Sequence, residues 1–129
     1  MKGKVLLIDD DQAILQILSR ALQEAGFETS ISSQAIGTTN RVKEFAPDVI
    51  IMDVMMPALA GNKLVKLLKD TMDTITNQPI MILVSNKHED ELKKLAQECG
   101  ADDYATKLSG PASVVRKVKE CMARKKKIG

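Results

Sequence analysis

Acidic side chains gather directly after a short apolar run near the start of the sequence. Asp9, Asp10 and Asp11 follow the apolar residues 6–8. Two carboxylates about 4 Å apart repel by roughly 4 kcal/mol at an effective dielectric near 20, so their proximity needs a cause. A hard divalent cation such as Mg²⁺ takes oxygen ligands and neutralises their charge. The spacing therefore indicates a cation site at the end of a buried segment.

Three further polar residues each come directly after a later run of β-forming residues. Asp53 adds another carboxylate, Ser85 a hydroxyl and Lys107 an ammonium. Each has a common structural use when it stands alone, because Asp and Ser cap helices and turns and Lys is mostly solvated. They form one site only if the fold brings the ends of these runs together.

Two kinds of segment alternate along the chain and must position these residues. Three of the β-forming runs are continuously apolar, as in parallel strands covered on both faces, and helical apolar periods lie between the runs. The expected strands are residues 4–8, 27–32, 48–52, 79–84 and 102–106, and the expected helical segments lie within 14–22, 34–45, 64–68, 92–99 and 111–122. This alternation predicts an open, doubly wound α/β sheet.

The carboxyl ends of strands in such a sheet meet at one edge, and ligands bind there. We therefore expect the polar residues at the strand ends to converge; they are Asp9, Asp10, Asp53, Ser85 and Lys107. Asp11 instead precedes the first helical segment and is predicted to cap it. The buried stripe of that helix is expected at Ile14, Ile17, Leu18, Ala21 and Leu22.

The composition indicates a single folded domain of residues 1–129, with no output domain visible. The chain is 44% hydrophobic, its net charge is +2, and no linker-like segment interrupts it. It has three aromatic residues and no Trp, which disfavours a base-stacking nucleic-acid surface. The basic residues 124–127 are interpreted as a helix end, where Lys and Arg complement the helix dipole. Neither direct DNA binding nor membrane contact is expected.

Cysteine usage and the N-terminal segment bear on the compartment. Cys99 and Cys121 lie far apart without a C-x-x-C spacing and are interpreted as reduced, partly buried side chains. The first apolar run is too short for a signal peptide, and no segment approaches a transmembrane span. These features favour a cytoplasmic protein.

With these residues in this order, the chain resembles a response-regulator receiver domain of two-component signal transduction, the CheY-like family. The matching segments are the pair Asp9-Asp10, Asp53 in "DVMMP", Ser85, and Lys107 at the end of "GADDYATK". The resemblance covers nearly the whole chain. It implies a flavodoxin-like fold, whose five-stranded parallel sheet has the order 2-1-3-4-5 with helices on both faces.

The resemblance implies a phosphoacceptor signalling domain rather than an enzyme, with Mg²⁺ as its cofactor. Asp53 would take a phosphoryl group from a sensor histidine kinase or a histidine phosphotransfer protein. Asp10, Asp53 and the backbone carbonyl of Met55 would ligate Mg²⁺ directly, and Asp9 would act through a metal-bound water. The phosphoryl oxygens would then lie close to the cation.

The remaining site residues would sense the phosphoryl group. Lys107 would pair with one phosphoryl oxygen and Ser85 would hydrogen-bond another, while Tyr104 would change rotamer together with Ser85. The surface formed by the last two helices and the last strand would then switch to regulate an unknown protein target. The implied assembly is a monomer or a weak dimer.

Leu108 and Asn86 depart from the family pattern, and Met55 and Lys87, each two residues after a site residue, form a third departure. Leu108 stands where a proline usually follows the lysine through a cis peptide, and Asn86 stands where a small residue is usual. A cis bond before a non-proline residue costs roughly 3–4 kcal/mol. The sequence therefore predicts a trans Lys107–Leu108 peptide in a loop that is more mobile than a proline-locked one, with Lys107 still directed towards Asp53.

These departures leave two alternatives open. A pseudo-receiver would bind partners without phosphorylation, and Leu108 and Asn86 favour it, whereas the intact aspartates and Lys107 argue against it. An α/β phosphohydrolase with an aspartate nucleophile would need a second acid/base aspartate two residues later. That position is Met55.

Overall fold

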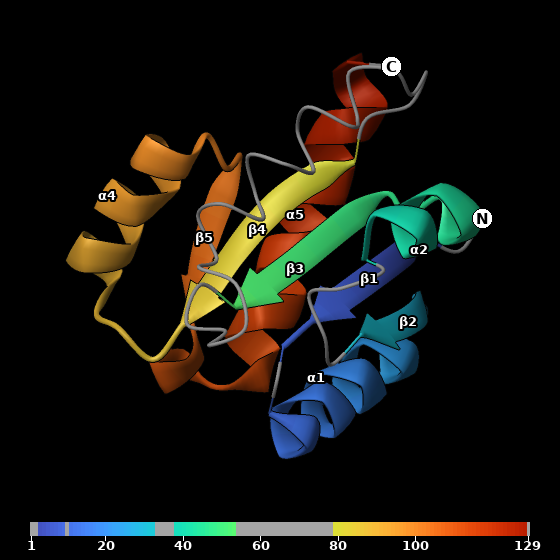
Figure 1. Cartoon of the computed structure of the whole chain (residues 1–129), viewed down its shortest axis with the longest axis horizontal. Coiled ribbons are helices and arrows are strands. Elements are labelled where there is room, and N and C mark those ends of the chain that lie inside the picture. Colours follow the sequence, from blue (N-terminus) through green and yellow to red (C-terminus); the bar gives the residue numbers. More distant parts are fainter. Residues whose placement is uncertain (1–2, 10, 33–37, 54–78, 129) are drawn as a thin grey trace.

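The computed structural model describes residues 3–9, 11–32, 38–53 and 79–128 (Figure 1). One parallel sheet forms the centre of the molecule. Its strands are β1 Lys4–Ile8, β2 Glu28–Ser32, β3 Val49–Asp53, β4 Ile80–Ser85 and β5 Asp103–Thr106. They lie in the order β2-β1-β3-β4-β5, which confirms the order implied by the resemblance.

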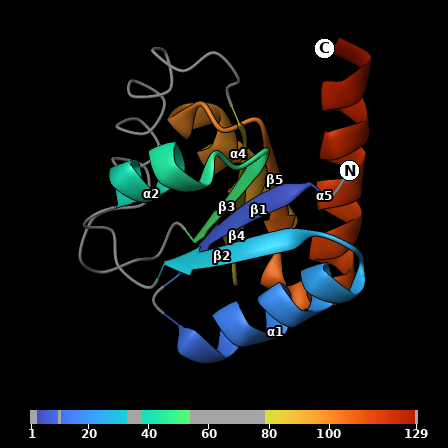
Figure 2. The same ribbon diagram turned by 90° about the vertical axis from the view of Figure 1, so that its right-hand side faces the viewer.

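Helices cover both faces of this sheet. They are α1 Gln12–Glu24, α2 Thr38–Phe45, α4 Glu89–Cys99 and α5 Pro111–Ile128, with a 3₁₀ turn, η1, at Lys107–Ser109. Figure 2 shows α1 and α5 on one side of the sheet and α2 and α4 on the other. The helical segment expected at residues 64–68 lies outside the described residues. Among the described helices, none is both long and apolar enough to cross a membrane.

Alternate residues of the central strands pack against opposite helical layers. Leu6 and Ile8 of β1 contact the core on the α2 and α4 side, and Val5 and Leu7 contact the core on the α1 and α5 side. All four side chains are buried. Because both faces of β1 are covered, its sequence is a continuous apolar run rather than an alternating one.

Two strands continue one residue beyond the apolar runs that predicted them. Asp53 is the last residue of β3 and pairs with Val84, and Ser85 is the last residue of β4 and pairs with Thr106. Ladder hydrogen bonds join backbone groups and do not depend on side-chain polarity. The polar residues at these ends are therefore held by the sheet itself.

The first helix begins as the sequence predicts. The Asp11 carboxylate accepts hydrogen bonds from the backbone N–H groups of Ala13 at 3.0 Å and Ile14 at 3.3 Å, which confirms its capping role. The expected buried stripe is wrong at Ile17, which is 49% exposed. The buried side is instead formed by Leu15, Leu18 and Leu22. The sheet, rather than the local period, decided which side of the helix is covered.

Replacing the cap should weaken the fold measurably. The Asp11→Ala variant leaves two N–H groups of the first turn without their side-chain acceptor, so its free energy of unfolding should fall by about 1 kcal/mol. Urea denaturation with EDTA present would measure it. Asp11→Asn is the matched control, because Asn caps helices about as well as Asp. An equal loss in both variants would show that the charge, rather than the cap, matters.

Candidate functional site

Polar side chains from several strands meet at the carboxyl edge of the sheet, where the arrowheads of Figure 1 end. Asp9 follows β1, Asp53 ends β3, Ser85 ends β4 and Lys107 follows β5. Asp9 is 3% exposed, Asp53 6% and Ser85 0%. The edge therefore holds two carboxylates and a hydroxyl that are almost fully removed from water.

The Lys107 side chain joins the two carboxylates. Its Nζ atom donates to Asp9 Oδ2 at 2.6 Å and to Asp53 Oδ2 at 3.1 Å. All three side chains are less than a tenth exposed. The predicted direction of Lys107 towards Asp53 is thus confirmed, although the two residues are 54 positions apart in the sequence.

The charge of Lys107 is stabilised by its neighbours. Burial by itself would lower the pKa of the ammonium, but the hydrogen bond to Asp9 and the charges of Asp53 and Asp9 outweigh burial. The pKa of Lys107 is consequently raised above its ordinary value of 10.5. Lys107 is therefore positively charged at neutral pH, and the two carboxylates do not face one another as a bare acidic pair.

The residues present fit a hard cation only in part. Among the described residues, no group of three or more His, Cys, Asp or Glu side chains could hold a metal ion. Two expected ligands, Asp10 and Met55, lie outside the described residues. Asp9, Asp53 and Lys107 together carry a net charge of −1, and their carboxylate oxygens are the donor type that Mg²⁺ takes. The chemistry of the edge is thus compatible with Mg²⁺.

Ser85 and Tyr104 lie on the same face of the sheet. The Ser85 hydroxyl accepts a hydrogen bond from the Lys87 N–H at 3.3 Å. Tyr104 is half-buried, packs against the core on the α4 side, and its ring centre lies 5.8 Å from the Lys117 ammonium. It pairs with Leu83, two positions before Ser85 in β4. The two expected switch residues therefore lie close in the sheet, without a direct hydrogen bond between them in the structure described.

The turn that carries Lys107 differs from the loop expected from the sequence. No cis peptide bond occurs in the described residues, which confirms a trans Lys107–Leu108 bond. The segment is a hydrogen-bonded 3₁₀ turn, in which the Thr106 hydroxyl accepts from the Leu108 N–H at 3.2 Å. Sequence reasoning missed Thr106. The preference of Thr for capping positions was the signal that could have found it.

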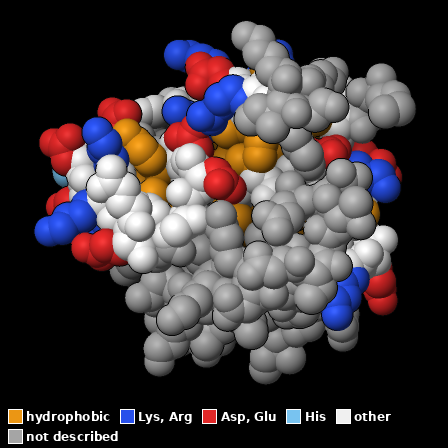
Figure 3. Space-filling model, turned by 90° about the horizontal axis from the view of Figure 1, so that it is seen from above, with side chains coloured by type: hydrophobic (Ala, Val, Ile, Leu, Met, Phe, Trp, Pro, Cys, Tyr) orange, Lys and Arg blue, Asp and Glu red, His pale blue; other side chains and the backbone are white. Residues whose placement is uncertain are grey.

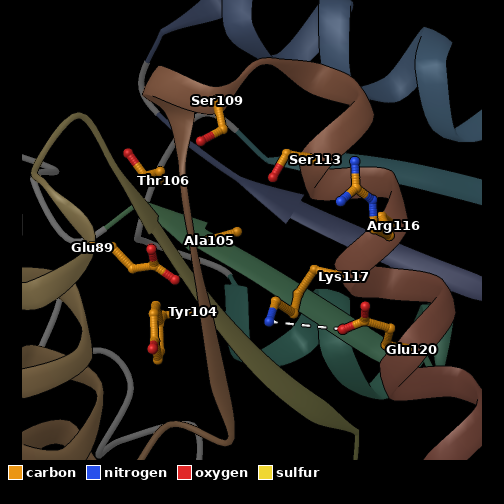
Figure 4. Close-up of a pocket in the computed structure, with 9 residues that line it drawn as sticks. All are labelled: Glu89, Tyr104, Ala105, Thr106, Ser109, Ser113, Arg116, Lys117 and Glu120. Atoms are coloured by element: carbon orange, nitrogen blue, oxygen red, sulfur yellow. Dashed lines mark ion pairs between the residues drawn. The ribbon is translucent and has the colours of Figure 1, made fainter.

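A shallow hollow of about 220 Å³ lies between α4 and α5, over β5. Figure 4 shows Glu89 and Tyr104 on the α4 side of β5, with Ser113, Arg116 and Lys117 reaching from α5. In Figure 3, acidic and basic side chains are interspersed on the left, where α4 lies. The hollow is lined mainly by polar side chains, with acidic and basic residues among them.

Ion pairs join side chains of α5 to Asp103, the first residue of β5. Asp103 accepts from Arg124 at 2.6 Å and lies 3.4 Å from the Lys117 ammonium. Burial alone would raise the pKa of Asp103, but hydrogen bonds from the Tyr104 backbone and from Arg124, with the Lys117 charge, lower it below its usual value. The neighbouring Cys121 is a free, buried thiol whose pKa is raised by burial. These pairs connect two turns of α5 to the first residue of β5.

Comparison with known families shows which family the chain belongs to. Residues 5–119 match the response regulator receiver domain family. The chain belongs to this family. A receiver domain is a signalling phosphoacceptor rather than an enzyme, and receiver domains typically use Mg²⁺.

Individual relatives agree with this assignment. The receiver domain is 33% identical to the alkaline phosphatase synthesis transcriptional regulatory protein PhoP of Bacillus subtilis, over 96% of this chain and 50% of that protein. It thus spans about half the length of the curated relatives it matches.

Two solved structures are similar in fold. A CheY-like receiver domain protein of Methanospirillum hungatei JF-1 is 23% identical, with a TM-score of 0.84 over the full length of both chains. The BeF3-activated DrrB receiver domain is 30% identical, with a TM-score of 0.78 over 95% of this chain and 99% of that one. The sheet order is thus that of the CheY-like fold.

Proposed function

We propose that this receiver domain accepts a phosphoryl group on Asp53, with Mg²⁺, and so regulates a downstream protein in the cytoplasm. The donor would be a sensor histidine kinase or a histidine phosphotransfer protein. The observation that carries the proposal is the buried Lys107 ammonium, which lies 2.6 Å from Asp9 and 3.1 Å from Asp53. A fixed cation beside a buried carboxylate is what transfer of an anionic group requires.

The transfer is a displacement at phosphorus. A carboxylate oxygen of Asp53 forms a new O–P bond while the P–N bond to the donor histidine breaks, and the leaving imidazole nitrogen takes up a proton. Bound Mg²⁺ would neutralise charge on the phosphoryl oxygens. The Mg²⁺ ion would be held directly by Asp10, Asp53 and the Met55 carbonyl, and through a water by Asp9. The product is an acyl phosphate on the protein.

Lys107 and Ser85 are placed to bind the transferred group. The ammonium is already 3.1 Å from Asp53 Oδ2, so an oxygen of a phosphoryl group attached to Asp53 comes within its reach. The Ser85 hydroxyl accepts from the Lys87 N–H, which leaves its own hydrogen able to donate to a phosphoryl oxygen. Both contacts would form only after phosphorylation.

Phosphorylation would change the conformation at Ser85 and, through it, the surface between α4 and α5. Movement of the Ser85 hydroxyl towards the phosphoryl group would open space for Tyr104, which lies on the same face of the sheet and lines the hollow between the two helices. The α4, β5 and α5 surface would thereby change its affinity for a protein target. BeF₃ activation of the DrrB receiver domain supports control of this kind.

The structure weakens one argument for a pseudo-receiver. Leu108 is one of its two supports, because the family proline that aims the lysine is missing. The trans turn nevertheless directs Lys107 at Asp53. Asn86, the second departure, is exposed. Phosphorylation therefore remains the function that the geometry supports best.

The test uses the purified chain and a small acyl phosphate as donor. With Mg²⁺ the intact mass should rise by one phosphoryl group within minutes, and with EDTA in place of Mg²⁺ the rise should be absent or much slower. No rise under either condition would overturn the proposed function. An equal rise with and without Mg²⁺ would overturn the role of the metal.

A further inference from the structure

The position of Lys107 depends on a turn that lacks proline. Lys107 is the first residue of η1, whose end is closed by the Gly110 N–H donating to the Lys107 carbonyl at 3.2 Å. Leu108, next in the turn, is 60% exposed and contributes little packing. Hydrogen bonds, rather than apolar contacts, must therefore hold this turn.

One side chain supplies the remaining bonds. Thr106 has extended backbone geometry, and its hydroxyl accepts from the Leu108 N–H at 3.2 Å. The same hydroxyl donates to the Lys87 carbonyl at 2.8 Å. Figure 4 shows Thr106 at the end of β5, near Ser109 of the turn. A single hydroxyl thus bridges the Lys107 turn and the segment that follows β4.

The bridge extends to Ser85. Thr106 and Ser85 are the last pair of the β4–β5 ladder. The Lys87 N–H donates to the Ser85 hydroxyl at 3.3 Å, while the carbonyl of the same residue accepts from Thr106. Lys87 therefore links Ser85, which would bind one phosphoryl oxygen, to the η1 turn, which presents Lys107.

We propose that the Thr106 hydroxyl is a positioning group: it holds the η1 turn so that Lys107 meets Asp53, and it couples that turn to the segment carrying Ser85. The expected effect on phosphoryl uptake rests on the proposed function, whereas the hydrogen bonds of Thr106 are present in the unphosphorylated structure. Removing the hydroxyl loses the hydrogen bonds to the Leu108 N–H, to the Lys87 carbonyl and, at 3.4 Å, to the Ser85 carbonyl, each of modest net strength. Together they should slow phosphoryl uptake by about tenfold.

The test compares Thr106→Val, which keeps the shape and removes the hydroxyl, with Thr106→Ser, which keeps the hydroxyl. Thr106→Ala also removes the hydroxyl, and because Ala is not β-branched its backbone preference differs from that of Val. Thr29→Val is the matched control, because Thr29 also bonds through its hydroxyl, to Ser19 and Gln23, but lies in β2. The donor is the same acyl phosphate with Mg²⁺.

Uptake should fall about tenfold in Thr106→Val and Thr106→Ala and stay within about twofold of wild type in Thr106→Ser and Thr29→Val. Wild-type uptake in Thr106→Val and Thr106→Ala would overturn the inference. So would a Thr106→Ser rate as low as that of Thr106→Val, since the hydroxyl would then not be the group that matters.

A second measurement does not need phosphorylation. Amide hydrogen exchange by NMR, in EDTA, should show the Leu108 N–H protected in wild type and Thr106→Ser, and exposed in Thr106→Val. Unchanged protection in Thr106→Val would overturn the inference. If the wild-type chain takes up no phosphoryl group, the proposed function fails, while the exchange data still decide the role of Thr106.

Discussion

The Asp53→Asn variant should take up no phosphoryl group under conditions in which the wild-type chain gains one. An amide oxygen is a poor nucleophile, and the substitution removes the carboxylate that ends β3 and lies 3.1 Å from the Lys107 ammonium. Intact mass at early times would measure the uptake. Peptide mass after reduction of the acyl phosphate would locate it.

Asp11→Asn serves as the matched control for this experiment. It makes the same chemical change close to the edge, but Asp11 caps α1 and Asn preserves that cap. We expect its uptake to equal that of wild type. Full labelling of Asp53→Asn would show that another residue accepts the group, and the assignment of Asp53 would then be wrong.

Removing the Lys107 charge should strongly destabilise the protein without Mg²⁺. In Lys107→Met two buried carboxylates, on Asp9 and Asp53, lose their shared ammonium. Deleting the cation of a buried ion pair removes most of the charge compensation of its carboxylates, and the free energy of unfolding should fall by about 3 kcal/mol. Urea denaturation at pH 7 in EDTA would measure it.

The pH and the metal should both change this deficit. The pKa of Lys107 is raised in the folded protein, so its contribution is complete below its unfolded value near 10.5 and is lost only as the pH rises above that value. The deficit of Lys107→Met should therefore be constant around neutral pH and should shrink only as the pH rises above 10.5, where wild-type Lys107 begins to lose its charge. Added Mg²⁺ should also reduce it.

Lys94→Met is the matched control for this variant. Lys94 is an exposed residue of α4, and surface substitutions of this kind change stability by about 0.5 kcal/mol or less. A loss in Lys107→Met that is as small as in the control would contradict the charge balance described above.

Much of the architecture could be predicted from local sequence patterns. The continuous apolar runs at residues 4–8, 48–52 and 79–84 predicted buried parallel strands, because helices on both faces require apolar side chains on both. Asp11 was predicted as a helix cap from residue type and position alone, since capping is a contact within one turn. The convergence of Asp9, Asp53 and Lys107 followed from the rule that parallel strands end at one edge.

Only the tertiary structure decided the contacts between segments distant in the sequence. Local periodicity placed Ile17 on the buried side of α1, but the neighbouring sheet covers a different side and leaves Ile17 half exposed. The missing proline after Lys107 gave no indication of the 3₁₀ turn found there, which Thr106 connects to Lys87, 19 residues away. Such a bond depends on the register of β4 against β5, which local patterns do not encode because it is set by the packing of the whole sheet.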